Sequence, residues 1–186
     1  DDCMIGSIGV KHISSLSNLI ELDLANNLIT DAGVKHIKSL SQLIKLNLSN
    51  NEISKAGTKQ LVALEKLEFL ELKRTAITSL NEFTNFPHLR RLNVSDTLVA
   101  DLTPIRYLLE KGITAKITDD WKGGILVENC PLIHPPPEIV KQGHEAVLNY
   151  FREIDAQGTA ALLEAKVLIV GEGRSGKTSL LRRLYQ

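Results

Sequence analysis

The feature that most constrains the fold is an internal repeat of 24 residues. The segment LIELDLANNLITDAGVKHIKSL, residues 19–40, returns as LIKLNLSNNEISKAGTKQLVAL, residues 43–64. A fixed period in this range is typical of solenoids. One unit cannot bury its own apolar face, whereas stacked units share a continuous core. The repeat therefore predicts a stacked array.

Each unit combines a short strand, a turn and a helix. Leu22 and Leu24 alternate with Glu21 and Asp23, as the two faces of a strand require. Asn27 can turn the chain at the end of the strand and bond to nearby backbone. This pattern resembles the leucine-rich repeat. The expected fold class is α/β: a leucine-rich-repeat solenoid, or right-handed β/α horseshoe.

The same alignment sets the order of elements. A helix is expected at residues 5–16, so the array is expected to be running already where the chain begins. The segment at residues 77–86 looks less helical, and a helix with Thr103 as N-cap and Pro104 at its first position should end at Gly112. Strands are expected near residues 19–24, 43–48, 67–72, 89–94 and 113–117, with a capping strand at 124–128.

Composition excludes some functions. Lys plus Arg equals Asp plus Glu, so nothing global favours nucleic acid or an anionic membrane. No apolar run approaches the roughly 20 residues of a membrane span. Cys3 and Cys130 are too few to indicate a disulfide framework. Residues 1–130 are interpreted as the repeat domain.

A composition shift follows the repeats. Residues 131–165 are interpreted as a proline-rich linker with a capping helix. Pro131 and the run of prolines at residues 135–137 favour an extended, semi-rigid segment. Residues 138–155 have helical spacing, closed by Gly158, and such a helix would seal the last repeat.

Residues 166–186 are interpreted as the start of a P-loop domain. The run KVLIV, residues 166–170, has the character of a strand buried on both faces. It leads into GEGRSGKT, residues 171–178, which matches G-x-x-x-x-G-K-[ST] before a helical segment. Backbone N–H groups of such a loop cradle phosphates, Lys177 would reach the β- and γ-phosphates, and Thr178 would bind Mg²⁺. The expected nucleotide-binding residues are Gly171, Gly173, Arg174, Ser175, Gly176, Lys177, Thr178 and Ser179.

Hydrolytic machinery is not visible. The chain ends within the first helix after the loop, with no downstream acidic or base-reading motif, so we assign no catalytic residue. One strand and one helix cannot form a parallel sheet alone, so this chain is expected to be a piece of a longer protein. A P-loop favours the cytoplasm. From these residues alone, GTP and ATP both remain open.

Three stretches together resemble the Roco family, in which leucine-rich repeats precede a Ras-like GTPase domain and a COR domain. They are the repeats, the connector NCPLIHPPPEIVKQGHEAVLNYFREI and the segment KVLIVGEGRSGKTSLLRRLY. The usual connector has N-P-L, whereas Cys130 intervenes here. The resemblance implies GTP or GDP with Mg²⁺, a signalling switch with the repeats as its regulatory arm, and a homodimer formed through the COR domain. The alternatives are an ATP-binding signalling NTPase and a pure interaction scaffold.

The outward strand positions are the candidate partner surface, because a solenoid usually binds proteins on its concave face. Their charges are mixed and indicate no partner type, and a merely solvated face is the alternative. These positions are Glu21, Asp23, Lys45, Asn47, Phe69, Glu71, Lys73, Arg91 and Asn93, followed by Ser95.

Overall fold

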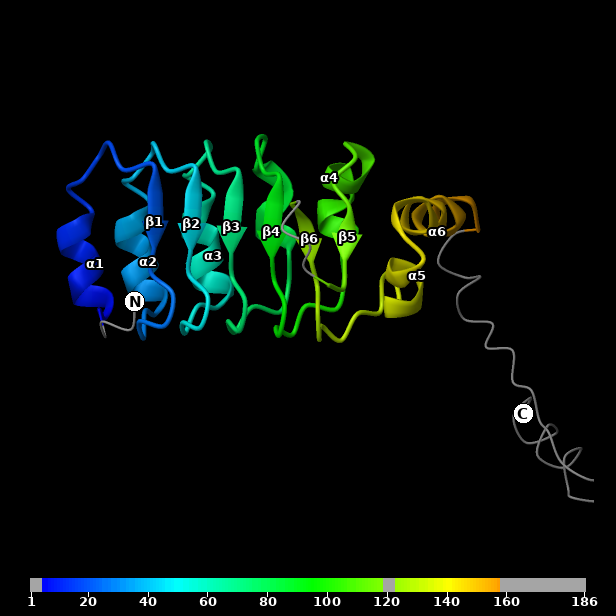
Figure 1. Ribbon diagram of the computed structural model, residues 1–186, viewed down its shortest axis with the longest axis horizontal. Coiled ribbons are helices and arrows are strands. Elements are labelled where there is room, and N and C mark those ends of the chain that lie inside the picture. The colour runs from blue at the N-terminus through cyan, green and yellow to red at the C-terminus, as the bar shows by residue number, and fades with distance from the viewer. Residues whose placement is uncertain (1–4, 119–122, 158–186) are drawn as a thin grey trace, which may run out of the picture. The chain divides into compact units, whose positions relative to one another are not determined.

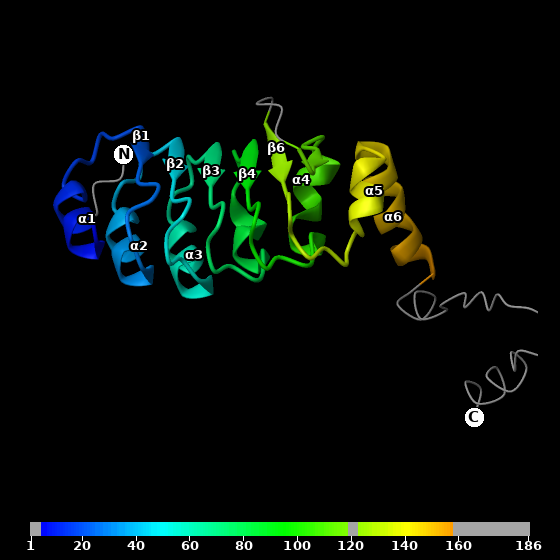
Figure 2. The same ribbon diagram turned by 60° about the horizontal axis from the view of Figure 1, so that its bottom comes forward.

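The computed structural model of the chain describes residues 5–118 and 123–157. The chain divides into two compact units, residues 1–152 and residues 153–186. The first unit is a row of repeats with the strands on one side and the helices on the other (Figures 1 and 2). The predicted strand, P-loop and helix of residues 166–186 lie outside the described residues.

The described strands form one parallel six-stranded sheet in the order β1-β2-β3-β4-β6-β5. The register repeats across the array, with Leu22 beside Leu46, Leu46 beside Leu70 and Leu70 beside Leu92. The strands are β1 (Glu21–Asp23), β2 (Lys45–Asn47), β3 (Phe69–Glu71), β4 (Arg91–Asn93), β5 (Ala115–Lys116) and β6 (Gly124–Leu126).

Helices cover one face of this sheet, and each of the first three has seven residues. Glycines at the third helical position allow neighbouring units to approach closely. A Cβ atom on Gly57 would lie 2.4 Å from Oδ1 of Asp31 in the preceding helix. The helical elements are α1 (Ser7–Ile13), α2 (Asp31–Ile37), α3 (Lys55–Leu61), the 3₁₀ turns η1 (Asn81–Asn85) and η2 (Thr103–Ile105), α4 (Arg106–Glu110), α5 (Pro137–Lys141) and α6 (His144–Gln157).

Buried polar side chains close the turn of each unit. Oδ1 of Asn51 accepts the backbone N–H groups of Asn27 and Ile29, at 3.2 and 2.8 Å. Its Nδ2 donates to the carbonyl oxygens of Leu24 and Leu48. Since every polar atom is paired, the buried amide ties one turn to the next without a desolvation penalty. The predicted role of the asparagine turn is confirmed.

Hydroxyl groups take over this role later in the array. Thr75 Oγ1 donates to the carbonyl oxygen of Leu72 at 2.7 Å, and Thr97 Oγ1 donates to that of Val94 at 2.6 Å. The next unit places Cys130 at the same position, where its thiol donates to Val94 as well. The cysteine that interrupts the connector motif is therefore the turn residue of the last repeat.

The order of the last two strands differs from the prediction. β6, rather than β5, pairs with β4, and β5 lies outside β6. The physical reason is the repeat pattern. Ile125, Val127, Cys130 and Leu132 fall at the core and turn positions of a leucine-rich unit, and all four are buried. The segment 113–117 has no such turn residue, and its strand β5 forms the edge of the sheet.

Two helical boundaries also differ from the prediction. The single helix expected at residues 138–155 is broken into α5 and α6 at Gly143, which has φ of 101°. Thr103 is the first residue of η2 rather than its N-cap, which is Leu102. The Asp101 carboxylate accepts the Thr103 backbone N–H at 2.8 Å. The weakly helical segment at residues 77–86 is confirmed as a 3₁₀ turn.

The segment after the proline run packs on the last unit. Val147 and Phe151 are buried, and the Arg106 guanidinium lies 5.5 Å from the centre of the Phe151 ring. Nδ1 of His134 and the hydroxyl of Tyr150 are 2.7 Å apart. This part of α6 therefore covers apolar surface that the last repeat would otherwise expose.

Candidate functional site

The candidate site is the sheet face opposite the helices, which we call the open face. Parallel pairing brings the predicted surface residues into cross-strand rows. One row runs from Glu21 through Lys45 and Phe69 to Arg91. The other row consists of Asp23, Asn47, Glu71 and Asn93.

Exposure falls along the open face. Glu21, Asp23 and Lys45 are exposed, whereas Arg91 and Asn93 are each only 7% exposed. On the next strand of the sheet, Leu126 is buried too. Solvent therefore reaches this face mainly over β1, β2 and β3.

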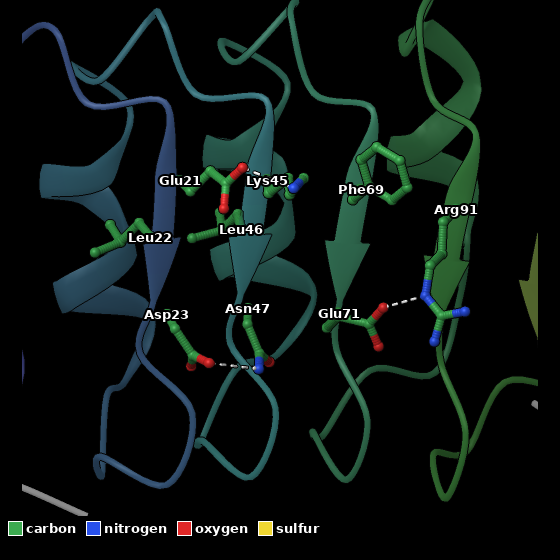
Figure 3. A pocket seen from close by; sticks show the side chains of 9 residues that line it. All are labelled: Glu21, Leu22, Asp23, Lys45, Leu46, Asn47, Phe69, Glu71 and Arg91. Carbon is green, nitrogen blue, oxygen red and sulfur yellow. Dashed lines mark hydrogen bonds and ion pairs between the residues drawn. The ribbon is translucent and has the colours of Figure 1, made fainter. Parts of the chain in front are cut away.

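A groove of about 460 Å³ lies over these strands (Figure 3). Phe69 contributes a partly exposed aromatic ring to it, and Nζ of Lys45 lies 5.7 Å from the centre of that ring. A cation at this distance is attracted by the electrons of the ring face. The lining residues are Glu21, Leu22, Asp23, Lys45, Leu46, Asn47, Phe69, Glu71 and Arg91.

Both cations of the groove are paired within the chain. Lys45 Nζ lies 2.6 Å from Oε1 of Glu21. The Arg91 guanidinium donates to Glu71, whose second oxygen accepts Asn93 Nδ2 at 2.7 Å. Because Arg91 is buried, this pair is shielded from water and holds β3 to β4, whereas the exposed Lys45 pair contributes little to stability.

Asp23 has a different environment. Its carboxylate accepts the backbone N–H of Ala25 at 2.9 Å and Nδ2 of Asn47 at 3.3 Å, and both donors are neutral. Its side chain is exposed on β1 and forms no ion pair among the described residues. Asp23 therefore presents a negative charge to solvent beside the groove.

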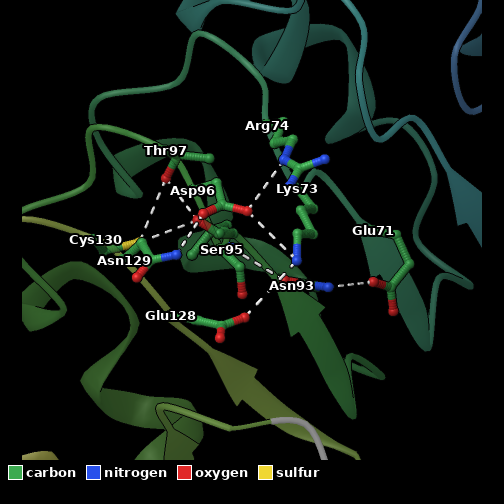
Figure 4. A network of polar contacts seen from close by, with 11 residues as sticks. Glu71, Lys73, Arg74, Asn93, Ser95, Asp96, Thr97, Glu128, Asn129 and Cys130 are labelled. Carbon is green, nitrogen blue, oxygen red and sulfur yellow. Dashed lines mark hydrogen bonds and ion pairs between the residues drawn. The ribbon is translucent and has the colours of Figure 1, made fainter.

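A second polar cluster lies where β3, β4 and β6 end (Figure 4). Lys73 Nζ is 3.4 Å from Asp96 and 3.7 Å from Glu128, and Arg74 also pairs with Asp96. The amide of Asn129 donates to Asp96 at 2.7 Å. This hydrogen bond, followed by the charges of Lys73 and Arg74, holds the pKa of Asp96 below its ordinary value, against the opposing effect of burial.

Asp96 and Glu128 lie beside the candidate surface but were not among the residues predicted for it. Asp96 comes next to Lys73 because β4 pairs with β3, and Glu128 comes next to Lys73 because β6 pairs with β4. The spacing of Ile125, Val127 and Cys130 is the signal that could have found this arrangement.

Cys130 is a structural residue rather than a reactive one. It is buried and free of disulfide bonds. Burial raises the pKa of its thiol, a shift that the hydrogen bond with Thr97 partly offsets. The expected phosphate-binding residues 171–179 lie outside the described residues. Within residues 5–118 and 123–157, no group of His, Cys, Asp or Glu could hold a metal ion, and no helix has the length and hydrophobicity to cross a bilayer.

Comparison with known proteins agrees with the repeat pattern. A family model described as leucine rich repeat matches residues 17–77 and 41–99. No curated protein sequence matches this chain.

Solved structures give partial matches. An internalin from Listeria monocytogenes is 20% identical over 66% of this chain and 38% of its own, with a TM-score of 0.49. A leucine-rich repeat protein from Leptospira interrogans is 31% identical over 54% of this chain and 26% of its own, with a TM-score of 0.45. The ectodomain of a membrane receptor kinase from Arabidopsis thaliana was solved in complex with Casparian strip integrity factor 2. It is 18% identical over 66% of this chain and 14% of its own, with a TM-score of 0.46. The match spans less than half of each of these chains.

The matched region coincides with the 24-residue period, the parallel strands β1–β4 and the buried turn residues. Residues 17–99 of this chain are therefore similar to the leucine-rich repeat family and form leucine-rich repeats.

Proposed function

We propose that the repeats bind a protein partner on the open face and act as the regulatory arm of a guanine-nucleotide-binding signalling protein. The partly exposed Phe69 in the groove is the observation that carries the first part. Covering an aromatic ring removes apolar surface from water, and aromatic residues are enriched in protein interfaces. Charged side chains around the ring would form the polar rim of such an interface.

Site-specific photo-crosslinking in cells tests partner binding. A benzophenone amino acid replaces Phe69 in one variant and the exposed Lys35 of α2 in the other. We expect a discrete protein adduct from position 69 that position 35 does not give. Equal labelling from both positions, or none from position 69, would favour the solvated-face alternative.

The second part of the proposal rests on residues 166–179. A β-branched run followed by G-x-x-x-x-G-K-[ST] is the sequence context of a P-loop. Gly171, Gly173 and Gly176 would let backbone N–H groups approach phosphate oxygens. Arg174, Ser175 and Ser179 would complete the loop and the start of the predicted helix. Lys177 would neutralise phosphate charge, and Thr178 would give its hydroxyl to Mg²⁺.

The resemblance of the connector to the Roco family supports GTP or GDP over ATP. It also supports a protein that dimerises through a domain other than the repeats, and the P-loop motif supports a cytoplasmic location. Isothermal titration of the full-length protein with GTP, GDP and ATP in the presence of Mg²⁺ tests this assignment. Preference for ATP would reject it in favour of an ATP-binding signalling protein.

Lys177→Ala separates nucleotide binding from a pure scaffold. We expect the variant to lose at least about tenfold in affinity for GTP, because removing a charged hydrogen-bond donor from a phosphate costs about 1.5–3 kcal/mol. The control variant is Lys166→Ala, which removes a lysine that precedes the loop. Unchanged affinity in Lys177→Ala would support the scaffold.

A further inference from the structure

We infer that the groove over β1, β2 and β3 binds an extended protein segment that carries an apolar side chain and, three or four residues away, a lysine or arginine. The inference rests on the proposed partner binding and specifies its chemistry. It follows from where the open face is accessible, from Phe69 and from the charge of Asp23.

Accessibility limits the size of the occupant. The open face is buried at β4 and β6, where Arg91, Asn93, Ser95 and Leu126 are all buried. The accessible part is therefore three strands wide, roughly 10 Å between the outer two at about 4.8 Å per strand. A groove of this width and a volume of about 460 Å³ fits a few side chains of a peptide segment.

Phe69 supplies the apolar contact. Its ring stands between Lys45 and Arg91 in the cross-strand row, and among the residues that the structure describes Lys45 is the cation over the ring (Figure 3). Both of these cations already pair with carboxylates, Lys45 with Glu21 and Arg91 with Glu71. A second cation would meet their charges above the ring, so an apolar side chain is the better partner for Phe69.

Asp23 supplies the charge preference. Three carboxylates and two cations line the groove, which leaves one negative charge in excess. Glu21 and Glu71 are the carboxylates that the cations neutralise, and the partners of Asp23 are neutral N–H groups. A lysine or arginine of the partner would complete this pairing, whereas an acidic side chain would be repelled.

The register sets the spacing of the two ligand residues. Asp23 lies two strands from Phe69 and two residues further along the strand direction. With strands about 4.8 Å apart and a rise of about 3.3 Å per residue, the two positions are roughly 12 Å apart. An extended segment that crosses the strands covers this span in three or four residues.

Two synthetic peptides test the inference by NMR titration of the ¹⁵N-labelled chain. Each has about nine residues in a Ser/Gly background, with Leu four residues after either Arg or Glu. We expect the Arg peptide to shift the amides of Asp23, Asn47 and Phe69, and the Glu peptide to leave them unchanged. Asp23→Asn should weaken binding of the Arg peptide about threefold and abolish its salt dependence, in line with an exposed ion pair.

Phe69→Ala provides the second variant and should weaken binding of the Arg peptide, because the apolar contact with its Leu is lost. Circular dichroism shows whether the two variants keep the fold. If the Glu peptide binds the groove as tightly as the Arg peptide, the charge assignment is overturned. If neither peptide shifts these amides at millimolar concentration, or if the shifts lie elsewhere, the inference is overturned as a whole. The cross-linking result at position 69 decides independently whether a partner uses this face.

Discussion

The thiol of Cys130 lies 3.6 Å from the hydroxyl of Thr97, and both groups donate to the carbonyl oxygen of Val94. Thr97 and Cys130 occupy equivalent turn positions of two adjacent strands, as Asn27 and Asn51 do at the start of the array. A cysteine is compatible with this position because the leucine-rich pattern accepts Asn or Cys there. The contact shows that the connector begins inside the last repeat.

Burial of Cys130 predicts a thiol that reacts slowly in the folded protein. The pKa of Cys130 is raised, so less thiolate is present at a given pH, and the thiolate is the nucleophile. We expect iodoacetamide to modify Cys130 far more slowly in buffer than in denaturant. Mass spectrometry of the tryptic peptide 123–141 measures the rate. Equal rates in the two conditions would contradict the buried placement.

Two leucines of similar chemistry should differ strongly in their contribution to stability. Leu46 is 1% exposed in the core and Leu28 is 59% exposed at a turn. Leu46→Ala should lower the free energy of unfolding by about 2–5 kcal/mol, because it leaves a cavity among close-packed side chains. Leu28→Ala should change it by less than about 0.5 kcal/mol. Urea unfolding followed by circular dichroism measures both, and similar losses would refute the repeat register.

Gly57 should resist substitution because of its neighbour Asp31. A Cβ atom at position 57 would lie 2.4 Å from Asp31 Oδ1, the oxygen that accepts the backbone N–H of Ser54. Overpacking costs about 1–3 kcal/mol, against a helix-propensity gain of up to about 1 kcal/mol, so Gly57→Ala should be destabilising.

A double-mutant cycle isolates this contact. In an Asp31→Ala background, the same Gly57→Ala change should cost clearly less free energy of unfolding, because the oxygen nearest the new Cβ is absent. Additive losses would show that Asp31 is not the group that Gly57 accommodates.

The lowered pKa of Asp96 predicts that the folded protein loses stability in acid. Its pKa is lower in the folded protein than in the unfolded chain, where it is near 3.9. The folded state therefore gains stability from this group above about pH 4, and the gain is lost as pH falls through the folded pKa. Urea midpoints between about pH 6 and pH 2 should fall more steeply for the wild type than for Asp96→Asn.

Asn129→Gly tests the main cause of that shift. The amide of Asn129 is the largest contributor, and glycine accepts the positive φ of 54° at this position. The acid-side loss of stability should be smaller in this variant than in the wild type. If stability falls in acid as steeply in Asn129→Gly as in the wild type, the lowered pKa of Asp96 is due to Lys73 and Arg74 instead.

Local spacing was sufficient to predict the regular repeats. Leu22, Leu46, Leu70 and Leu92 recur at almost constant intervals, and each lies at the matching position of its strand. The position of Asn51 between two turns also follows from the period, because an interval of 24 residues places it directly beside Asn27. Residues 166–186 stay at the level of a sequence prediction.

Strand pairing and chain direction that depend on residues outside one repeat could not be predicted in the same way. Ile113–Ile117 and Gly124–Glu128 both have strand character, and only competition for the free edge of β4 decides which one pairs there. Likewise, the helical spacing of residues 138–155 does not show that Gly143 adopts a positive φ, at which the chain changes direction.

The sequence by itself therefore determined the repeat unit, its strand register and its buried turn residues, because these depend on spacing within one or two units. Tertiary structure decided that Arg91 and Asn93 are buried, that Phe69 and Asp23 remain accessible, and that β6 precedes β5 in the sheet. The physical reason is that burial and pairing depend on segments that meet only after the array has stacked.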